Sequence, residues 1–168
     1  VLFRSSPDGK RLYVSEQKGE HVDVIDTQTK KFIKKIAVGD SPEAVYVSQD
    51  GKFISVANEE ANTISIIDAK SLKITSTIRV KGKNPEHAVF SPDAKLIFTS
   101  AEDADNVDVI DVKQKKQIAQ IDVGHRPRGI GFTPDGKKAF VASEMADTLF
   151  VIDVEKKRSE EHTSELQS

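Results

Sequence analysis

The segment His125–Gly129 (His-Arg-Pro-Arg-Gly) carries the side chains whose types and spacing could do binding chemistry. Two guanidinium groups and an imidazole within four residues can hold a carboxylate or a phosphate through charge-assisted, bidentate hydrogen bonds. Related segments earlier in the chain carry a glutamate at the same place, and one of them also carries a histidine. The candidate ligand-binding residues are therefore His125, Arg126, Arg128, His87, Glu86 and Glu43.

The same residues have a second, purely structural interpretation. Two acidic segments lie between these candidates in the sequence and a third follows the last of them, at Glu59-Glu60, Glu102-Asp103-Ala104-Asp105 and Glu144-Met145-Ala146-Asp147. Arg126 and Arg128 could simply pair with them, while His125 bonds a turn. Ion pairs on exposed loops are common and contribute about 0–1 kcal/mol each. The sequence leaves both interpretations open.

Other kinds of site have weaker support. The carboxylates of Glu102, Asp103 and Asp105 resemble part of a calcium loop, but the glycine and the later glutamate of that pattern are missing. His21 has no second histidine at metal-ligand spacing. The sequence contains no Gly-x-Ser-x-Gly segment, no phosphate-binding glycine loop and no cysteine. We therefore expect no catalytic residue, no metal site and no cofactor in this sequence.

The elements that must position the candidates come from a repeat of about 42 residues. One marker is a turn sequence, found as Ser6–Lys10, Ser48–Lys52, Ser91–Lys95 and Thr133–Lys137. A second is an apolar pair followed by aspartate, at Asp26, Asp68, Asp111 and Asp153. A third is a proline after a glycine-containing connection, at Pro42, Pro85 and Pro127. This period, with turn residues and no helical pattern, is typical of a β-propeller with one four-stranded blade per repeat.

The second repeat shows the expected strands A to D. They cover 43–48, 52–58, 63–68 and 73–80, with a tight turn at Gln49-Asp50-Gly51. The predicted fold is all-β: about four blades of four-stranded antiparallel sheet, forming an open arc of a larger propeller, expected to have seven blades. The D–A and B–C connections must then emerge on one face, which holds the candidate residues. The A–B and C–D turns on the opposite face are rich in lysine.

The two ends do not continue the repeat. Residues 158–168 match a translated sequencing adapter at every position, and residues 1–5 match the end of the opposite adapter. We expect both ends to be non-native. The expected domains are blade 1 (6–40, lacking strand A), blade 2 (41–83), blade 3 (84–125) and blade 4 (126–157, lacking strand D). The formal net charge is −2, and −1 without the ends, which argues against a general nucleic-acid binder.

The second strands carry a further pattern. The segments Tyr13-Val14-Ser15-Glu16, Ser55-Val56-Ala57-Asn58, Phe98-Thr99-Ser100-Ala101 and Phe140-Val141-Ala142-Ser143 resemble the YVTN tetrapeptide. With the neighbouring Pro-Asp-Gly-Lys and Val-Ile-Asp sequences, residues 6–157 resemble YVTN-family β-propeller repeats. The resemblance implies a bacterial or archaeal protein that is periplasmic, secreted or attached to the cell surface. Related propellers include lactonase-like hydrolases, haem d1 or quinoprotein-associated domains and binding scaffolds, so the resemblance implies a platform rather than a reaction.

Two functions follow as expectations. The first is a non-catalytic scaffold that binds a protein or a small anionic ligand on the face of the D–A and B–C connections. The alternative is the propeller domain of an enzyme, either a lactonase-like hydrolase or a haem- or quinone-associated redox protein. We expect no nucleic-acid partner and no membrane span in this piece, and a full-length protein that is monomeric.

Overall fold

Each repeat of the sequence forms one antiparallel sheet in the computed structural model, which describes residues 2–160. The strands of each sheet lie side by side in chain order. Sheet one contains β1 (Phe3–Ser5), β2 (Arg11–Glu16), β3 (His21–Asp26) and β4 (Phe32–Ala37). Sheet two contains β5 (Pro42–Val47), β6 (Phe53–Asn58), β7 (Thr63–Asp68) and β8 (Lys73–Arg79).

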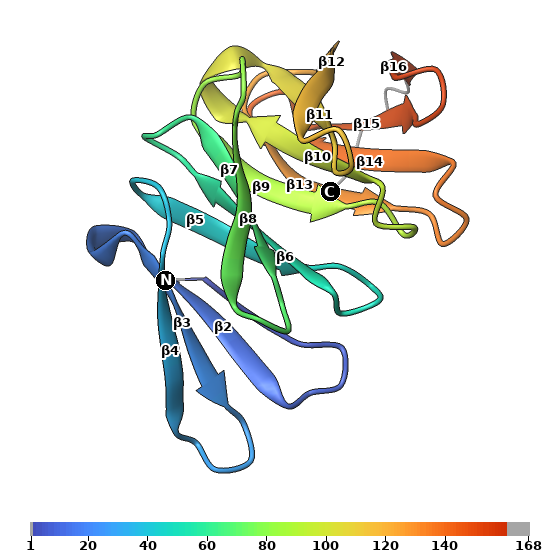
Figure 1. The fold of residues 1–168 in the computed structure, drawn as a ribbon. Helices are drawn as coiled ribbons and strands as arrows, with labels where there is room; N and C mark the ends of the chain where they lie inside the picture. The colour runs from blue at the N-terminus through green and yellow to red at the C-terminus, as the bar shows by residue number, and fades with distance from the viewer. Residues whose placement is uncertain (1, 161–168) are drawn as a thin grey trace.

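The other two repeats give the same pattern. Sheet three contains β9 (Pro85–Phe90), β10 (Leu96–Ala101), β11 (Asn106–Asp111) and β12 (Lys116–Asp122). Sheet four contains β13 (Pro127–Phe132), β14 (Lys138–Ser143), β15 (Thr148–Asp153) and β16 (Arg158–Glu160). Short 3-10 turns, η1 (Gln17–Gly19) and η2 (Glu102–Ala104), lie in the B–C connections of sheets one and three. Figure 1 shows the sheets following one another from the blue to the red end of the chain. The all-β architecture of four-stranded sheets is confirmed.

The turn between the first two strands of each sheet is held by the serine or threonine and the aspartate of the repeated sequence. In sheet two, the Ser48 hydroxyl donates to Asp50 at 2.7 Å, and the Lys52 amide donates to the same carboxylate oxygen at 3.1 Å. The next residue after the aspartate has a positive φ, 70° at Gly51 and 57° at Ala94 in sheet three. Glycine adopts this conformation without steric cost, which explains its use in three of the four turns.

The aspartate at the end of each third strand closes the next turn. Asp68 accepts hydrogen bonds from the amide and the hydroxyl of Ser71, both at 2.7 Å. Asp111 accepts from the Gln114 amide at 2.7 Å in the same way. These bonds confirm a structural role for the repeated aspartates, and they lower the pKa of both carboxyl groups.

The core lies between the sheets, and side chains of each middle strand alternate between the two neighbouring sheets. In β7, Ile66 packs toward sheet three, whereas Ile67 packs toward sheet one. Between sheets three and four, Val109 packs with Val141 and Ile152. This packing places the first strands β5, β9 and β13 next to one another, so that residues at their beginnings meet.

The outer sheets differ from the expectation of three strands each. Phe3–Ser5 pairs with β2, and Arg158–Glu160 pairs with β15, so the adapter-like ends supply short strands in the A and D positions. Each has three residues, compared with six or seven for its counterparts. Main-chain hydrogen bonds to an open sheet edge need no particular side chains, which explains why these sequences can pair there. The described residues contain no helix of the length and apolarity needed to cross a membrane.

Candidate functional site

The site is built by the connection into β13 and by the first residues of β9 and β13. His125 and Arg126 lie in the connection, Arg128 lies in β13, and Glu86 lies in β9. Arg126 has a φ of 60°, and Ser41 and Asn84 at the equivalent positions have similar values. The repeated backbone turn therefore sets the direction in which this segment enters its sheet.

Arg128 lies at the centre of an ion-pair network. Its Nη1 donates to Glu86, and its Nε donates to Glu144 at 3.2 Å. The distance from its Nη1 to the nearer oxygen of Glu102 is 3.9 Å. The contacts join the strands of sheets three and four to both B–C connections. They confirm that the D–A and B–C connections share one face.

Arg126 and His125 contact the B–C connection of sheet three. The Arg126 Nε donates to Glu102, and the distance from the same nitrogen to Glu144 is 3.7 Å. The backbone amide of Arg126 donates to Asp105 at 3.2 Å, and His125 Nδ1 lies 2.7 Å from the other oxygen of that carboxylate. Both arginines are thus paired with carboxylates, as the structural interpretation expects.

Glu86 and Glu102 shift each other's pKa in opposite directions inside this network. Burial raises the pKa of Glu86 to about 7, and its hydrogen bond with Glu102 acts in the same direction, while Arg128 opposes both. The same hydrogen bond is the main cause that lowers the pKa of Glu102. Glu86 is only 7% exposed. Loss of water is the largest of these causes, so the pKa is raised despite the pairing with Arg128.

His87 has a different partner, which the sequence analysis missed. Its Nδ1 lies 2.8 Å from the hydroxyl of Tyr46 in β5. Burial is the main cause that lowers the pKa of His87, and the charge of Arg128 adds to it. The sequence did contain a signal, since Tyr46 interrupts an apolar run in a first strand. A histidine whose neutral form is favoured, bonded to a partly buried phenol, therefore lies beside the arginine network.

Glu43 does not join the arginines. It accepts a hydrogen bond from Gln17 in sheet one. Glu59 lies close to it, accepts from the Ser41 hydroxyl at 3.2 Å, and has a pKa raised by burial and by the charge of Glu43. Sequence equivalence with Glu86 therefore does not bring Glu43 into the same cluster.

An open hollow of about 570 Å³ lies next to the network. It is lined by Glu102, Asp103, Asp105, His125, Arg126 and Met145. Within residues 2–160 the Nη groups of Arg126 make no hydrogen bond, so they can still donate to a ligand. Three carboxylates line the hollow, however, so its charge at neutral pH is negative. Among the residues that the structure describes, no three His, Cys, Asp or Glu side chains are grouped so that they could hold a metal ion.

Comparison with known proteins gives matches to one family and to solved structures. The family described as "Lactonase, 7-bladed beta-propeller" matches residues 26–120. Kuenenia stuttgartiensis hydrazine synthase is 30% identical with a TM-score of 0.86, and the match covers 95% of this chain and 47% of that protein's chain. No curated protein matches the chain.

Two further structures share the fold at lower identity. Dihydro-heme d1 dehydrogenase NirN in complex with DHE is 20% identical with a TM-score of 0.76, over 95% of this chain and 36% of that chain. A functionally unknown protein from Desulfotomaculum acetoxidans is 15% identical with a TM-score of 0.76, over 90% of this chain and 50% of that chain. The chain thus spans half or less of the length of these three structures.

Proposed function

Because the chain belongs to the lactonase family of seven-bladed β-propellers, we propose that it forms part of a propeller scaffold that binds a partner protein on the face of the D–A and B–C connections. The observation that carries this proposal is the charged network around Arg128, beside the open hollow at Arg126. The network fixes side chains from two sheets in place before a partner arrives. Such preorganisation reduces the ordering cost of binding.

The charge of the hollow favours a partner with basic groups. Glu102, Asp103 and Asp105 offer acceptors for lysine or arginine side chains, and Met145 is 70% exposed and offers an apolar contact. Charge complementarity of this kind speeds association and selects the partner. We therefore propose that the partner protein binds through a segment that carries basic residues.

A small anion is the other partner that the sequence suggested. It would have to compete with Glu102 and Glu144 for the arginines, because both guanidinium groups already pair with carboxylates. The free Nη groups of Arg126 and the exposed imidazole of His125 would be its receiving atoms. We rank this assignment second for that reason.

Fluorescence anisotropy with labelled hexalysine and hexaglutamate peptides at low salt tests the proposal. We expect hexalysine to bind and Asp105→Asn with Asp103→Asn to weaken it about tenfold, with little change in Arg126→Ala. Glu155→Gln is the matched control, since Glu155 is exposed in a C–D turn on the opposite face. Hexaglutamate binding that Arg126→Ala abolishes would support the anionic ligand and contradict the basic partner.

A lactonase-like hydrolase is the second candidate function, and Glu86 is the observation in its favour. A buried carboxyl group with a pKa of about 7 beside an arginine is suited to general acid–base catalysis near neutral pH. Assay of glucono-δ-lactone hydrolysis in the purified protein and in Glu86→Gln tests it. Turnover lost in this variant would make the propeller an enzyme, and equal rates in protein and buffer would count against it.

The remaining expectations stay proposals. A haem- or quinone-associated redox role rests on the family resemblance, and a haem absorption band in the purified protein would support it. A periplasmic or cell-surface location rests on the same resemblance, and cell fractionation of the source organism would test it.

A further inference from the structure

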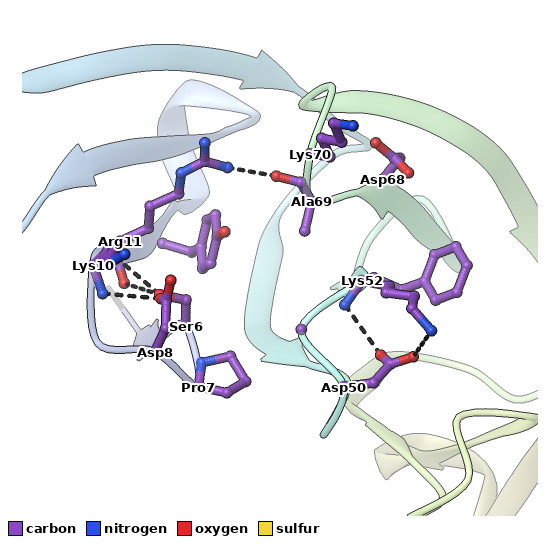
Figure 2. Close-up of a pocket in the computed structure, with 13 residues that line it drawn as sticks. Ser6, Pro7, Asp8, Lys10, Arg11, Asp50, Lys52, Asp68, Ala69 and Lys70 are labelled. Carbon is purple, nitrogen blue, oxygen red and sulfur yellow. Dashed lines mark hydrogen bonds and ion pairs between the residues drawn. The ribbon is translucent and has the colours of Figure 1, made fainter.

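A cleft of about 640 Å³ opens between sheets one and two on the opposite face, among the A–B and C–D turns (Figure 2). Its rim includes the cationic side chains of Lys10, Arg11, Lys52 and Lys70, and Phe53 contributes an apolar surface. The cleft lies on the other side of the molecule from the arginine network. It is therefore a separate site from the one in the proposed function.

Two departures from the repeat open this cleft. Arg11 stands where sheets two and three carry Phe53 and Leu96, and Ala69 stands where sheets three and four carry Val112 and Val154. The larger apolar residues pack against the cores between the other sheets and narrow the corresponding spaces: between sheets three and four, a hollow of about 380 Å³ remains beside Leu96 and Val154. Ala69, which is smaller than valine, and Arg11, which is polar, therefore leave more room between sheets one and two.

The guanidinium group of Arg11 is fixed in this space. Its Nη1 donates to the backbone oxygen of Ala69 at 2.5 Å, across the boundary between the sheets (Figure 2). Nε and Nη2 make no hydrogen bond within residues 2–160, so they remain available to a ligand. A guanidinium group held through one nitrogen is preorganised to receive an anion through the others.

The lysines around Arg11 add free positive charge. Lys10 and Lys70 are exposed and form no ion pair with any described residue, whereas Lys52 pairs with Asp50 at 3.0 Å. In Figure 2, Lys70 lies at the top of the view, and Lys10 and Arg11 lie on the left beside Ser6 and Asp8. These groups can approach one bound molecule from different directions.

The carboxylates of the cleft are engaged in their own turns. Asp8 accepts from the Ser6 hydroxyl at 2.6 Å and from the Lys10 amide at 3.1 Å, and Asp68 accepts from Ser71 at 2.7 Å. Together with Asp50 they leave an excess of one positive charge among the lining residues. One oxygen of each of Asp8 and Asp68 accepts the turn donors, and Asp50 pairs with Lys52, so the excess charge that a ligand meets is positive.

We propose that this cleft binds a small multivalent anion, a phosphate-bearing or polycarboxylate metabolite, with Arg11, Lys10 and Lys70 receiving its charged groups. The apolar part of the ligand lies against Phe53. Bidentate guanidinium contacts suit both phosphate and carboxylate, so the two ligand classes share this chemistry.

Isothermal titration with inorganic pyrophosphate and with citrate tests the proposal and separates the two classes. We expect saturable binding of at least one probe. Arg11→Phe should weaken it roughly tenfold or more, since it removes a charged donor and places in the cleft the residue that fills the equivalent space elsewhere. Lys70→Gln should weaken binding severalfold without changing the packing.

Two controls keep the outcome clear. Lys137→Gln changes the lysine at the equivalent turn position of sheet four, outside the cleft, and should leave binding unchanged. Arg126→Ala should also leave it unchanged, which separates this site from the arginine network. The proposal would be overturned if neither probe showed saturable binding. It would also be overturned if the unchanged protein, Arg11→Phe and Lys70→Gln bound with equal affinity. If Arg11→Phe does not fold, the affinity of Lys70→Gln alone decides.

Discussion

Replacing Glu86 with glutamine should make the stability of this protein less dependent on pH. Glu86 is 7% exposed, hydrogen-bonds Glu102 and pairs with Arg128, and burial raises its pKa from 4.5 to about 7. Two opposing effects therefore meet at one carboxyl group. Loss of water favours the protonated acid, whereas the arginine favours the carboxylate. The variant shows which effect is the larger.

The direction of the effect follows from proton binding. Between pH 4.5 and 7 the folded protein binds more protons at Glu86 than the unfolded chain does. The stabilisation from this group is therefore complete below pH 4.5 and is lost as the pH rises through 7. At about 1.4 kcal/mol for each pKa unit, the full change is at most about 3 kcal/mol, because the lowered pKa of Glu102 acts in the opposite direction. Glutamine resembles the protonated acid and does not titrate.

Urea unfolding followed by circular dichroism between pH 5 and pH 8.5 measures this contribution. We expect Glu86→Gln and the unchanged protein to have similar stability at pH 5, and the variant to be up to about 3 kcal/mol more stable at pH 8.5. Glu144→Gln is the matched control, because Glu144 bonds the same arginine but its side chain is 53% exposed. A Glu86→Gln variant that is less stable than the unchanged protein at pH 8.5 would refute the reasoning, because the pairing with Arg128 would then be the dominant effect.

Three other changes test the packing. Gly82→Ala should destabilise the protein by about 1–3 kcal/mol in urea unfolding, because the new Cβ would overlap the Cβ of Ala101, whereas Gly131→Ala, with nothing within 4 Å, should cost little. Asp108→Ala should cost about 1–3 kcal/mol in the same assay, because it removes the acceptor of buried donors, including the Gly82 amide at 2.7 Å. The isolated 168-residue chain should self-associate, because sheet four leaves apolar side chains uncovered: Leu149 is 37% exposed and Phe140 is only partly buried. Light scattering measures this, and a monodisperse monomer would contradict it.

The turns and the strand pattern could be predicted from the sequence because they depend on neighbouring residues. A serine, an aspartate and a glycine within four positions are enough to form the bonds seen at Ser48, Asp50 and Gly51. Alternation of apolar residues fixed which side chains face each neighbouring sheet, and the repeat fixed the number of sheets. The common face of the D–A and B–C connections then followed from the order of antiparallel strands alone.

The candidate site was predictable only in part. The sequence placed Arg126, Arg128 and Glu86 on one face, and it offered ion pairing with the acidic connections as an alternative to ligand binding. It could not show that Glu43 would pair with Gln17, or that His87 would bond Tyr46. These pairs join residues in neighbouring sheets, and their choice depends on the direction in which each side chain leaves its strand.

The sequence by itself therefore determined the repeat, the turns and the faces of the sheets, since each of these arises from contacts within about ten residues. Tertiary structure alone decided the burial of Glu86, which is what raises its pKa, and the opening of the cleft at Arg11 and Ala69. Both depend on how closely two sheets approach at one point. That distance is set by the combined volume of side chains that lie about 40–60 positions apart in the sequence, such as Arg128 with Glu86 and Arg11 with Ala69. A local sequence pattern does not contain this information.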